Sequence, residues 1–263
     1  MDLGLKGRVA LVAASSKGLG RAIAEELAAE GASLVLCARG EPALSATAAE
    51  IAGQYGTEIL ALPADVGVPG EAARVVRQGI ARFGRIDILV TNSGGPPAGK
   101  FEALTPEMWA QAESLVLGSV VEFCRAALPG MKERGWGRIL NIASIAAKQP
   151  VDNLMLSNSI RAAVLGFART LANEVAKTGV TVNNLLPGFT RTERMVELSE
   201  VAAARDGVTP EQALARYAAD IPMGRLAEPR EFSALAVFLA SERASYITGQ
   251  SWAVDGGWIR GLL

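Results

Sequence analysis

The sequence predicts a single α/β domain with a doubly wound parallel sheet, because short apolar runs alternate with helical patterns along most of its 263 residues. The apolar runs are continuous rather than interrupted by polar residues, which is typical of strands buried on both faces. Right-handed crossovers between such strands would place helices on both sides of the sheet. No linker, internal repeat or low-complexity segment divides the chain, so we expect one domain over residues 1–263.

Four of the predicted strands lie in the first half of the chain, at 8–14, 33–38, 58–66 and 86–92. Between them we expect helices at 18–31, 41–56 and 69–83. The first helix is closed by Gly31, and the second has Pro42 in its first turn and Gly56 at its end. Proline at the start of a helix and glycine just after it are both typical boundary residues.

The second half of the chain predicts three further strands, at 137–144, 180–188 and 251–254. A long helix starts at Thr105, which is followed by Pro106, and runs to about residue 134. Further helices are expected at 153–178 and 229–240. The mostly polar helical segment 192–220 is the least core-like part of the chain. We interpret it as a lid over a site, with a plain surface excursion as the alternative.

Composition excludes several kinds of function. The net charge is −1 and no basic run is present, so no nucleic-acid partner is expected. The chain has no histidine, and no Cys/Asp/Glu cluster has metal-ligand spacing, so we expect no metal site. The apolar N-terminal stretch is too short to span a bilayer and predicts a first strand rather than a signal peptide or membrane anchor. Two cysteines, Cys37 and Cys124, are too few for a disulfide framework, which favours reduced thiols in a cytoplasmic protein.

Polar or glycine residues stand at the carboxyl end of each of the first six predicted strands. They are the turn 13–20, Arg39, Asp65 with Val66, Asn92 with Ser93 and Gly94, Ser144, and 187–192. Ligands of open parallel sheets bind at this edge, beside the switch in strand order. Six polar strand ends in register therefore predict a nucleotide site.

The first of these turns, AASSKGLG, predicts a phosphate-binding loop. Ala14 stands where the usual dinucleotide fingerprint has its first glycine, but the spacing of the later glycines is kept and a helix follows at once. Glycines there let a pyrophosphate approach the backbone, and the helix N-terminus supplies N–H groups. The candidate binding residues are Ala14, Ser16, Lys17, Gly18, Leu19 and Gly20. The alternative is a strand-to-helix turn that holds no ligand.

The end of the second strand discriminates between coenzymes. An acidic residue there would bind the ribose hydroxyls of NAD, but the segment LCARG has none. Arg39 and Lys17 are two cations that suit a 2′-phosphate, so NADP(H) is favoured and NAD(H) is the alternative. Both cations could instead be ordinary surface charges.

These motifs together resemble the short-chain dehydrogenase/reductase family, and most closely its acyl-carrier-protein reductase-like branch. The segments that carry the resemblance are ADV (64–66), LVTNSGG (89–95), RAALPGMKERGWGRILNIAS (125–144), NNLLPGFTRT (183–192) and ERASYITGQSWAVDGG (242–257). The resemblance implies that Pro187, Gly188, Thr190 and Thr192 bind the carboxamide and phosphate side of the coenzyme.

The resemblance also implies a catalytic centre of asparagine, serine, tyrosine and lysine. Ser144 matches the serine, whereas Ser157 stands at the tyrosine position, Arg161 at the lysine position and Val116 near the asparagine position. A serine hydroxyl is a far weaker acid than a phenol, and a guanidinium cannot relay a proton as lysine can. We expect a bound ribose and phosphate, or an acidic substrate group, to compensate the Arg161 charge. The alternative is pairing with a backbone carbonyl or a neighbouring carboxylate.

Lys148 is the outside candidate for the missing acid, because its loop follows Ser144 and should line the substrate pocket. A solvated loop lysine is the alternative. Tyr217 lies in the predicted lid and is expected to anchor it rather than to enter the site.

Three functions remain open at this point. The first is an NADP(H)-dependent oxidoreductase that acts on a small carbonyl or secondary alcohol, with Ser144 holding the oxygen and Ser157, Arg161 or Lys148 replacing the phenol. The second is a catalytically silent dinucleotide-binding sensor or scaffold, and the third is a lyase or isomerase on the same fold. The resemblance further implies a homodimer or homotetramer built on the helices at 105–134 and 153–178.

Overall fold

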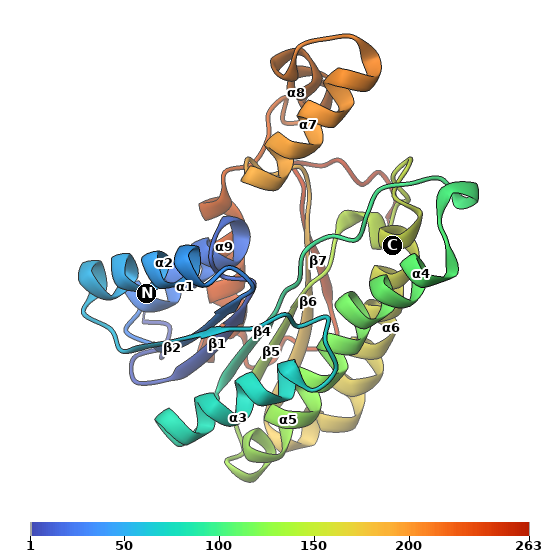
Figure 1. The fold of residues 1–263 in the computed structure, drawn as a ribbon. Helices are drawn as coiled ribbons and strands as arrows, with labels where there is room; N and C mark the ends of the chain where they lie inside the picture. The colour runs from blue at the N-terminus through green and yellow to red at the C-terminus, as the bar shows by residue number, and fades with distance from the viewer. Residues whose placement is uncertain (1, 263) are drawn as a thin grey trace.

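The structure is a computed structural model that describes residues 2–262, so the outermost residues of the predicted domain, 1 and 263, lie outside the described part. One sheet of seven parallel strands runs in the order β3-β2-β1-β4-β5-β6-β7 (Figure 1). The strands are β1 (Val9–Ala13), β2 (Ser33–Ala38), β3 (Ile59–Pro63), β4 (Ile88–Thr91), β5 (Gly137–Ile142), β6 (Val180–Pro187) and β7 (Ser251–Val254). The order reverses between β1 and β4, which confirms the predicted doubly wound sheet.

Helices cover both faces of this sheet. One face carries α3 (Glu71–Phe83), α5 (Ser119–Glu133) and α6 (Met155–Val175), and the other carries α1 (Gly18–Ala29), α2 (Glu41–Tyr55) and α9 (Pro229–Ala240) (Figure 1). Successive side chains of a strand point to opposite faces, so β1 contributes Leu11 to one core and Val12 to the other. The two cores hold the sheet rigidly and so fix the positions of its strand ends.

The long helix predicted from Thr105 consists of three consecutive parts. They are α4 (Pro106–Glu113), a π-helical turn (Ser114–Gly118) and α5. By length and composition the whole stretch Pro106–Glu133 could cross a membrane, and 39% of its most apolar window is buried. Phe123, Cys124 and Met131 of this stretch lie in the core against the sheet, as in the core helix of a globular domain.

Several predicted boundaries differ from the observed ones by one to three residues, and two of these differences have a clear structural reason. The third strand ends at Pro63 rather than at residue 66, because its neighbour β2 ends at Ala38 and offers no partner beyond that pair. The helix predicted from residue 153 begins at Met155, because Asn153 has a φ of 62° and so cannot belong to a right-handed helix.

The polar segment 192–220 forms two helices, α7 (Glu193–Asp206) and α8 (Pro210–Ala219), which stand beyond the carboxyl ends of the strands (Figure 1). Thr192 caps α7 by accepting a hydrogen bond from the Met195 N–H at 3.4 Å. Gly207, with a φ of 66°, ends α7 and reverses the chain towards α8. The segment therefore has the helical structure that its sequence predicts, and its action as a lid stays a prediction.

A row of polar side chains, which we call the polar ladder, runs from the central strand β4 to the edge strand β7 through Thr91, Asn141, Asn184 and Ser251. These residues are register partners on β4, β5, β6 and β7. Thr91 Oγ1 donates to Asn141 Oδ1 (2.8 Å), Asn141 Nδ2 donates to Asn184 Oδ1 (3.1 Å), and Asn184 Nδ2 donates to Ser251 Oγ (3.0 Å). The ladder therefore joins the strands on the α6 side of the switch point through side chains as well as through the backbone.

Candidate active site

The turn after β1 has the geometry of a phosphate-binding loop. Ala14, in the place of the first fingerprint glycine, adopts a φ of 49°, the left-handed region that glycine occupies most readily. Gly18 has a φ of 60° and begins α1. A Cβ on Gly20 would lie 2.4 Å from the Ala14 carbonyl oxygen, so only glycine lets the helix pack this closely on the turn.

The N-terminus of α1 is suited to an anion. Its N-cap residue, Lys17, makes no side-chain cap, and the first turn holds no acidic residue. The first backbone N–H groups of such a helix lack partners and carry partial positive charge. Together with the close approach at Gly20, this end of α1 fits the diphosphate of a dinucleotide.

The two cations expected near the ribose are both exposed. Arg39 follows β2, and its Nη2 lies 3.9 Å from the position of a Cβ on Gly94, which follows β4. The Lys17 Nζ lies 3.4 Å from Glu197 Oε1 of α7. The structure thus brings Arg39 to the loop after β4, whereas Lys17 engages the segment above the site.

The other predicted coenzyme residues lie at the same sheet edge. Asp65 is exposed and accepts the Gly67 N–H at 3.0 Å, which closes a tight turn after β3, while Val66 is buried. Asn92 and Ser93 are half-buried after β4. Beyond β6, Pro187, Gly188, Thr190 and Thr192 lead into α7, and Thr190 is buried. These residues therefore all lie beyond the carboxyl edge of the sheet.

Ser157 and Arg161 lie one turn apart on α6, and both are buried, with 9% and 8% of their surface exposed. Arg161 Nη1 donates to the carbonyl oxygens of Ile142 (3.0 Å) and Ala143 (2.6 Å) at the end of β5. Among the described residues, no partner is found for its Nε or Nη2. The structure thus contains the carbonyl pairing that the sequence left as the alternative, and part of the guanidinium stays available.

Burial lowers the pKa of Arg161 to about 10. The side chain is therefore still protonated at neutral pH. Because its two carbonyl partners are dipoles rather than anions, the positive charge at the head of α6 has no counter-ion among the described residues.

Ser144 follows directly on these two carbonyls. It is half-buried, and its Oγ accepts the Ala146 N–H at 3.1 Å at the start of a short 3₁₀ turn (Ile145–Ala147). Arg161 therefore ties the helix that carries Ser157 to the strand end that carries Ser144. The three side chains predicted from the sequence share one anchored corner of the fold.

Three further candidates are placed less favourably. Lys148 ends the 3₁₀ turn with an exposed side chain, so the confined surroundings considered for it are not found. Val116 lies in the π-helical turn with 3% of its surface exposed and packs in the core. Tyr217 of α8 stacks on Phe189 with ring centroids 4.9 Å apart, which agrees with an anchoring role.

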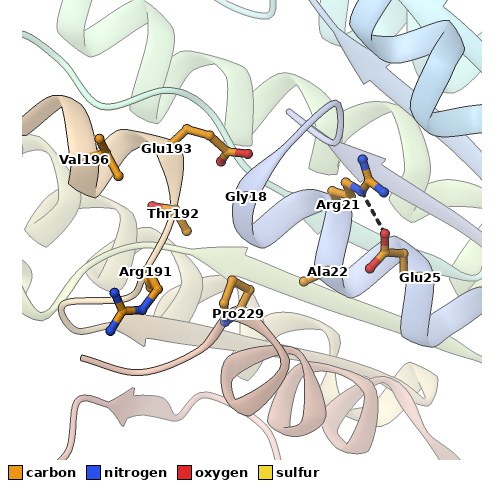
Figure 2. Close-up of a pocket in the computed structure, with 9 residues that line it drawn as sticks. All are labelled: Gly18, Arg21, Ala22, Glu25, Arg191, Thr192, Glu193, Val196 and Pro229. Atoms are coloured by element: carbon orange, nitrogen blue, oxygen red, sulfur yellow. Dashed lines mark hydrogen bonds and ion pairs between the residues drawn. The ribbon is translucent and has the colours of Figure 1, made fainter. Parts of the chain in front are cut away.

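Sequence reasoning missed the acidic residues at the start of α7. A cleft of about 410 Å³ lies between α1 and α7 and is lined by Gly18, Arg21, Ala22, Glu25, Arg191, Thr192, Glu193, Val196 and Pro229 (Figure 2). Glu193 and Glu197 stand four residues apart just after the Thr192 cap. That spacing was the available signal, because it places both carboxylates on one helix face.

Comparison with known proteins gives consistent matches over the whole chain. The family described as enoyl-(acyl carrier protein) reductase matches residues 13–259. A D-beta-hydroxybutyrate dehydrogenase of Cupriavidus necator is 36% identical over 258 residues, which cover 97% of this chain and 99% of the relative. A 3-oxoacyl-[acyl-carrier-protein] reductase of Escherichia coli is 33% identical over 255 residues, which cover 97% and 98%. The crystal structure of L-sorbose reductase from Gluconobacter frateurii, complexed with NADPH and L-sorbose, is 36% identical, with a TM-score of 0.96 over the full length of both chains.

Proposed function

The chain belongs to the short-chain dehydrogenase/reductase family, and we propose on that premise that it is an NADP(H)-dependent oxidoreductase of a small carbonyl or secondary alcohol with a non-standard catalytic centre. One observation carries the proposal. The phosphate-binding turn with its bare α1 N-terminus and the corner of Ser144, Ser157 and Arg161 lie beyond the same edge of the sheet. Ligands of doubly wound folds bind at that edge.

The residues present fit the coenzyme. The turn from Ala14 to Gly20 would hold the diphosphate, Lys17 and Arg39 the 2′-phosphate, and the loops after β3, β4 and β6 the remaining parts. When bound, the nicotinamide supplies or accepts the hydride. The preference for NADP(H) over NAD(H) is supported by the two cations and by the lack of an acid after β2.

The chain's own residues would handle the substrate oxygen. The Ser144 hydroxyl donates a hydrogen bond to it, and the free part of the Arg161 guanidinium stabilises the negative charge that develops there. Arg161 would stabilise this negative charge without donating a proton, because its pKa of about 10 keeps the guanidinium protonated at neutral pH. The proton that completes a reduction then has to reach the oxygen from Lys148 or from water held by Ser157.

The test combines coenzyme binding with turnover. Calorimetry should detect binding of NADPH, and NADPH absorbance should fall with at least one member of a panel of ketones and β-ketoacyl thioesters. Binding without turnover of any substrate would favour a silent dinucleotide-binding protein over an oxidoreductase. Conversion of a substrate without any change in NADPH would favour a lyase or isomerase. No heat with either coenzyme at millimolar concentration would overturn the proposal.

We also propose a homodimer or homotetramer built on the α4–α5 and α6 helices. Ala162, Ala163 and Gly166 of α6 are exposed small residues that allow close helix packing. Leu115, Leu117 and Leu128 of the stretch Pro106–Glu133 are only partly buried within one subunit, which leaves some apolar surface for a partner copy. Light scattering after size-exclusion chromatography should give a molecular mass of two or four times 27.4 kDa.

The buried free thiols Cys37 and Cys124 agree with the cytoplasmic location expected from the sequence.

A further inference from the structure

The start of α7 brings carboxylates onto the phosphate-binding turn. The Thr192 Cγ2 lies 3.6 Å, and the Glu193 Oε2 3.7 Å, from the position that a Cβ on Gly18 would take. Figure 2 shows the Glu193 side chain reaching from α7 towards Gly18 at the head of α1. The negative end of this side chain therefore stands at the positive end of α1.

No residue of α1 itself meets that positive end, since its N-cap and its first turn provide neither a side-chain cap nor an acid. An anion near the first turn of a helix is stabilised by the free N–H groups and the helix dipole. Glu193 supplies such an anion from a different segment of the chain. A coenzyme diphosphate would need the same place.

Glu197, one turn further along α7, engages the lysine of the turn. Its Oε1 lies 3.4 Å from Lys17 Nζ, and its Oε2 lies 3.3 Å from Arg194 Nη1. Hydrogen bonds from Arg194 and Lys17 hold the pKa of this carboxyl below its ordinary value, so it is ionised at neutral pH. Lys17 thus already has an anionic partner, although it is one of two cations proposed for the 2′-phosphate.

We infer that Glu193 and Glu197 compete with the phosphates of NADP(H) for the phosphate-binding turn and so set the affinity and the selectivity for the coenzyme. The inference rests on the proposed function. Glu193 competes with the diphosphate that NADPH and NADH share, whereas Glu197 competes through Lys17 with the 2′-phosphate that only NADPH carries. Because like charges repel, bound coenzyme has to displace both carboxylates and with them the start of α7.

The test measures the dissociation constants of NADPH and NADH by calorimetry for the full-length chain and near-isosteric variants. Glu197→Gln should tighten NADPH binding by about threefold and leave NADH unchanged, a size that suits an exposed ion pair. Glu193→Gln should tighten both coenzymes by about the same factor. Glu200→Gln, at an exposed position of the same helix, is the matched control and should change neither.

A second set of variants, which carries Lys17→Gln, tests whether Glu197 acts through Lys17. In Lys17→Gln, the further change Glu197→Gln should no longer improve NADPH binding. If wild type binds NADPH but Glu197→Gln and Glu193→Gln leave both constants unchanged, the competition is refuted and the proposed function stands. If neither wild type nor the double variant Glu193→Gln/Glu197→Gln binds a coenzyme, both fail. Binding by the double variant alone would support the competition but would overturn the proposed function for the wild-type chain.

Discussion

Arg161 Nη1 lies 2.6 Å from the carbonyl oxygen of Ala143, so a buried guanidinium on α6 hydrogen-bonds to the residue directly before Ser144. The same nitrogen also holds the carbonyl of Ile142. This single side chain links the helix, the strand end and the reacting corner of the proposed site.

Replacing Arg161 with Met should lower the free energy of unfolding by about 3 kcal/mol, because two buried carbonyls lose a charge-assisted donor. Urea denaturation followed by circular dichroism measures the change. Glu174→Gln, at an exposed position of the same helix, should stay within about 0.5 kcal/mol of wild type. An Arg161→Met protein as stable as wild type would show that the anchor contributes nothing.

If the Ser144 hydroxyl binds the substrate oxygen as proposed, replacing Ser144 with Ala should lower kcat for the substrate found by about 100-fold and leave the NADPH dissociation constant unchanged. The loss of the cap on Ala146 adds about 1 kcal/mol of destabilisation, which unfolding measures separately. Ser159→Ala, exposed on α6, is the control for kcat. Equal kcat in wild type and Ser144→Ala would remove this serine from the reaction.

Gly20→Ala should destabilise the fold and abolish coenzyme binding, because the new Cβ would stand 2.4 Å from the Ala14 carbonyl oxygen and push α1 off the turn. The matched substitution is Gly53→Ala in α2, where a Cβ meets nothing within 4 Å. It should raise stability by about 0.5–1 kcal/mol through helix propensity. Thermal unfolding of the two variants should therefore shift in opposite directions.

Stability should fall as the pH rises from 8 to 10, because burial raises the pKa of Cys37 and Cys124 from 9.0 to about 12. With a folded-state pKa above the unfolded one, each thiol contributes stability that is complete below pH 9 and is lost as the pH rises towards 12. By pH 10 the loss is on the order of 1 kcal/mol per thiol.

The double variant Cys37→Ala/Cys124→Ala should show a flatter pH dependence over that range, whatever its stability at pH 8. Arg161 acts in the opposite direction, since its folded-state pKa is lowered from 12.5 to about 10, but this contribution develops only above pH 10. Equal slopes in the variant and the wild type would show that the thiols ionise alike in both states.

Replacing Asn141 with Ala should cost about 2–4 kcal/mol of unfolding free energy, because it removes the middle of the polar ladder and leaves Thr91 and Asn184 without their partner. Ser251→Ala at the half-buried end of the ladder should cost less, since water can replace its hydroxyl. Equal losses at the two positions would contradict a cost that depends on burial.

The strand ends could be predicted from the sequence because each depends on a local pattern: an apolar run, then a polar or glycine residue. Carbonyl pairing of Arg161 could be considered as an alternative, but its partners Ile142 and Ala143 could not be identified, because every residue carries a backbone carbonyl. The carboxylates at the start of α7 were overlooked because their significance depends on how that helix docks on Gly18, about 175 residues away in the chain. The ladder was missed because Asn141 and Asn184 gain their role only from register.

The polar ladder also acts while the sheet assembles. A slip of β6 by two residues along β5 would keep every side chain on its face but set Asn141 beside Val182 or Leu186. The Asn141 amide would then lie beside an apolar side chain without its Asn184 partner, which would cost about 1–3 kcal/mol of free energy. Misaligned pairings of these parallel strands are thus penalised as they form, which gives the folding chain an error-correcting step that apolar side chains alone would not provide.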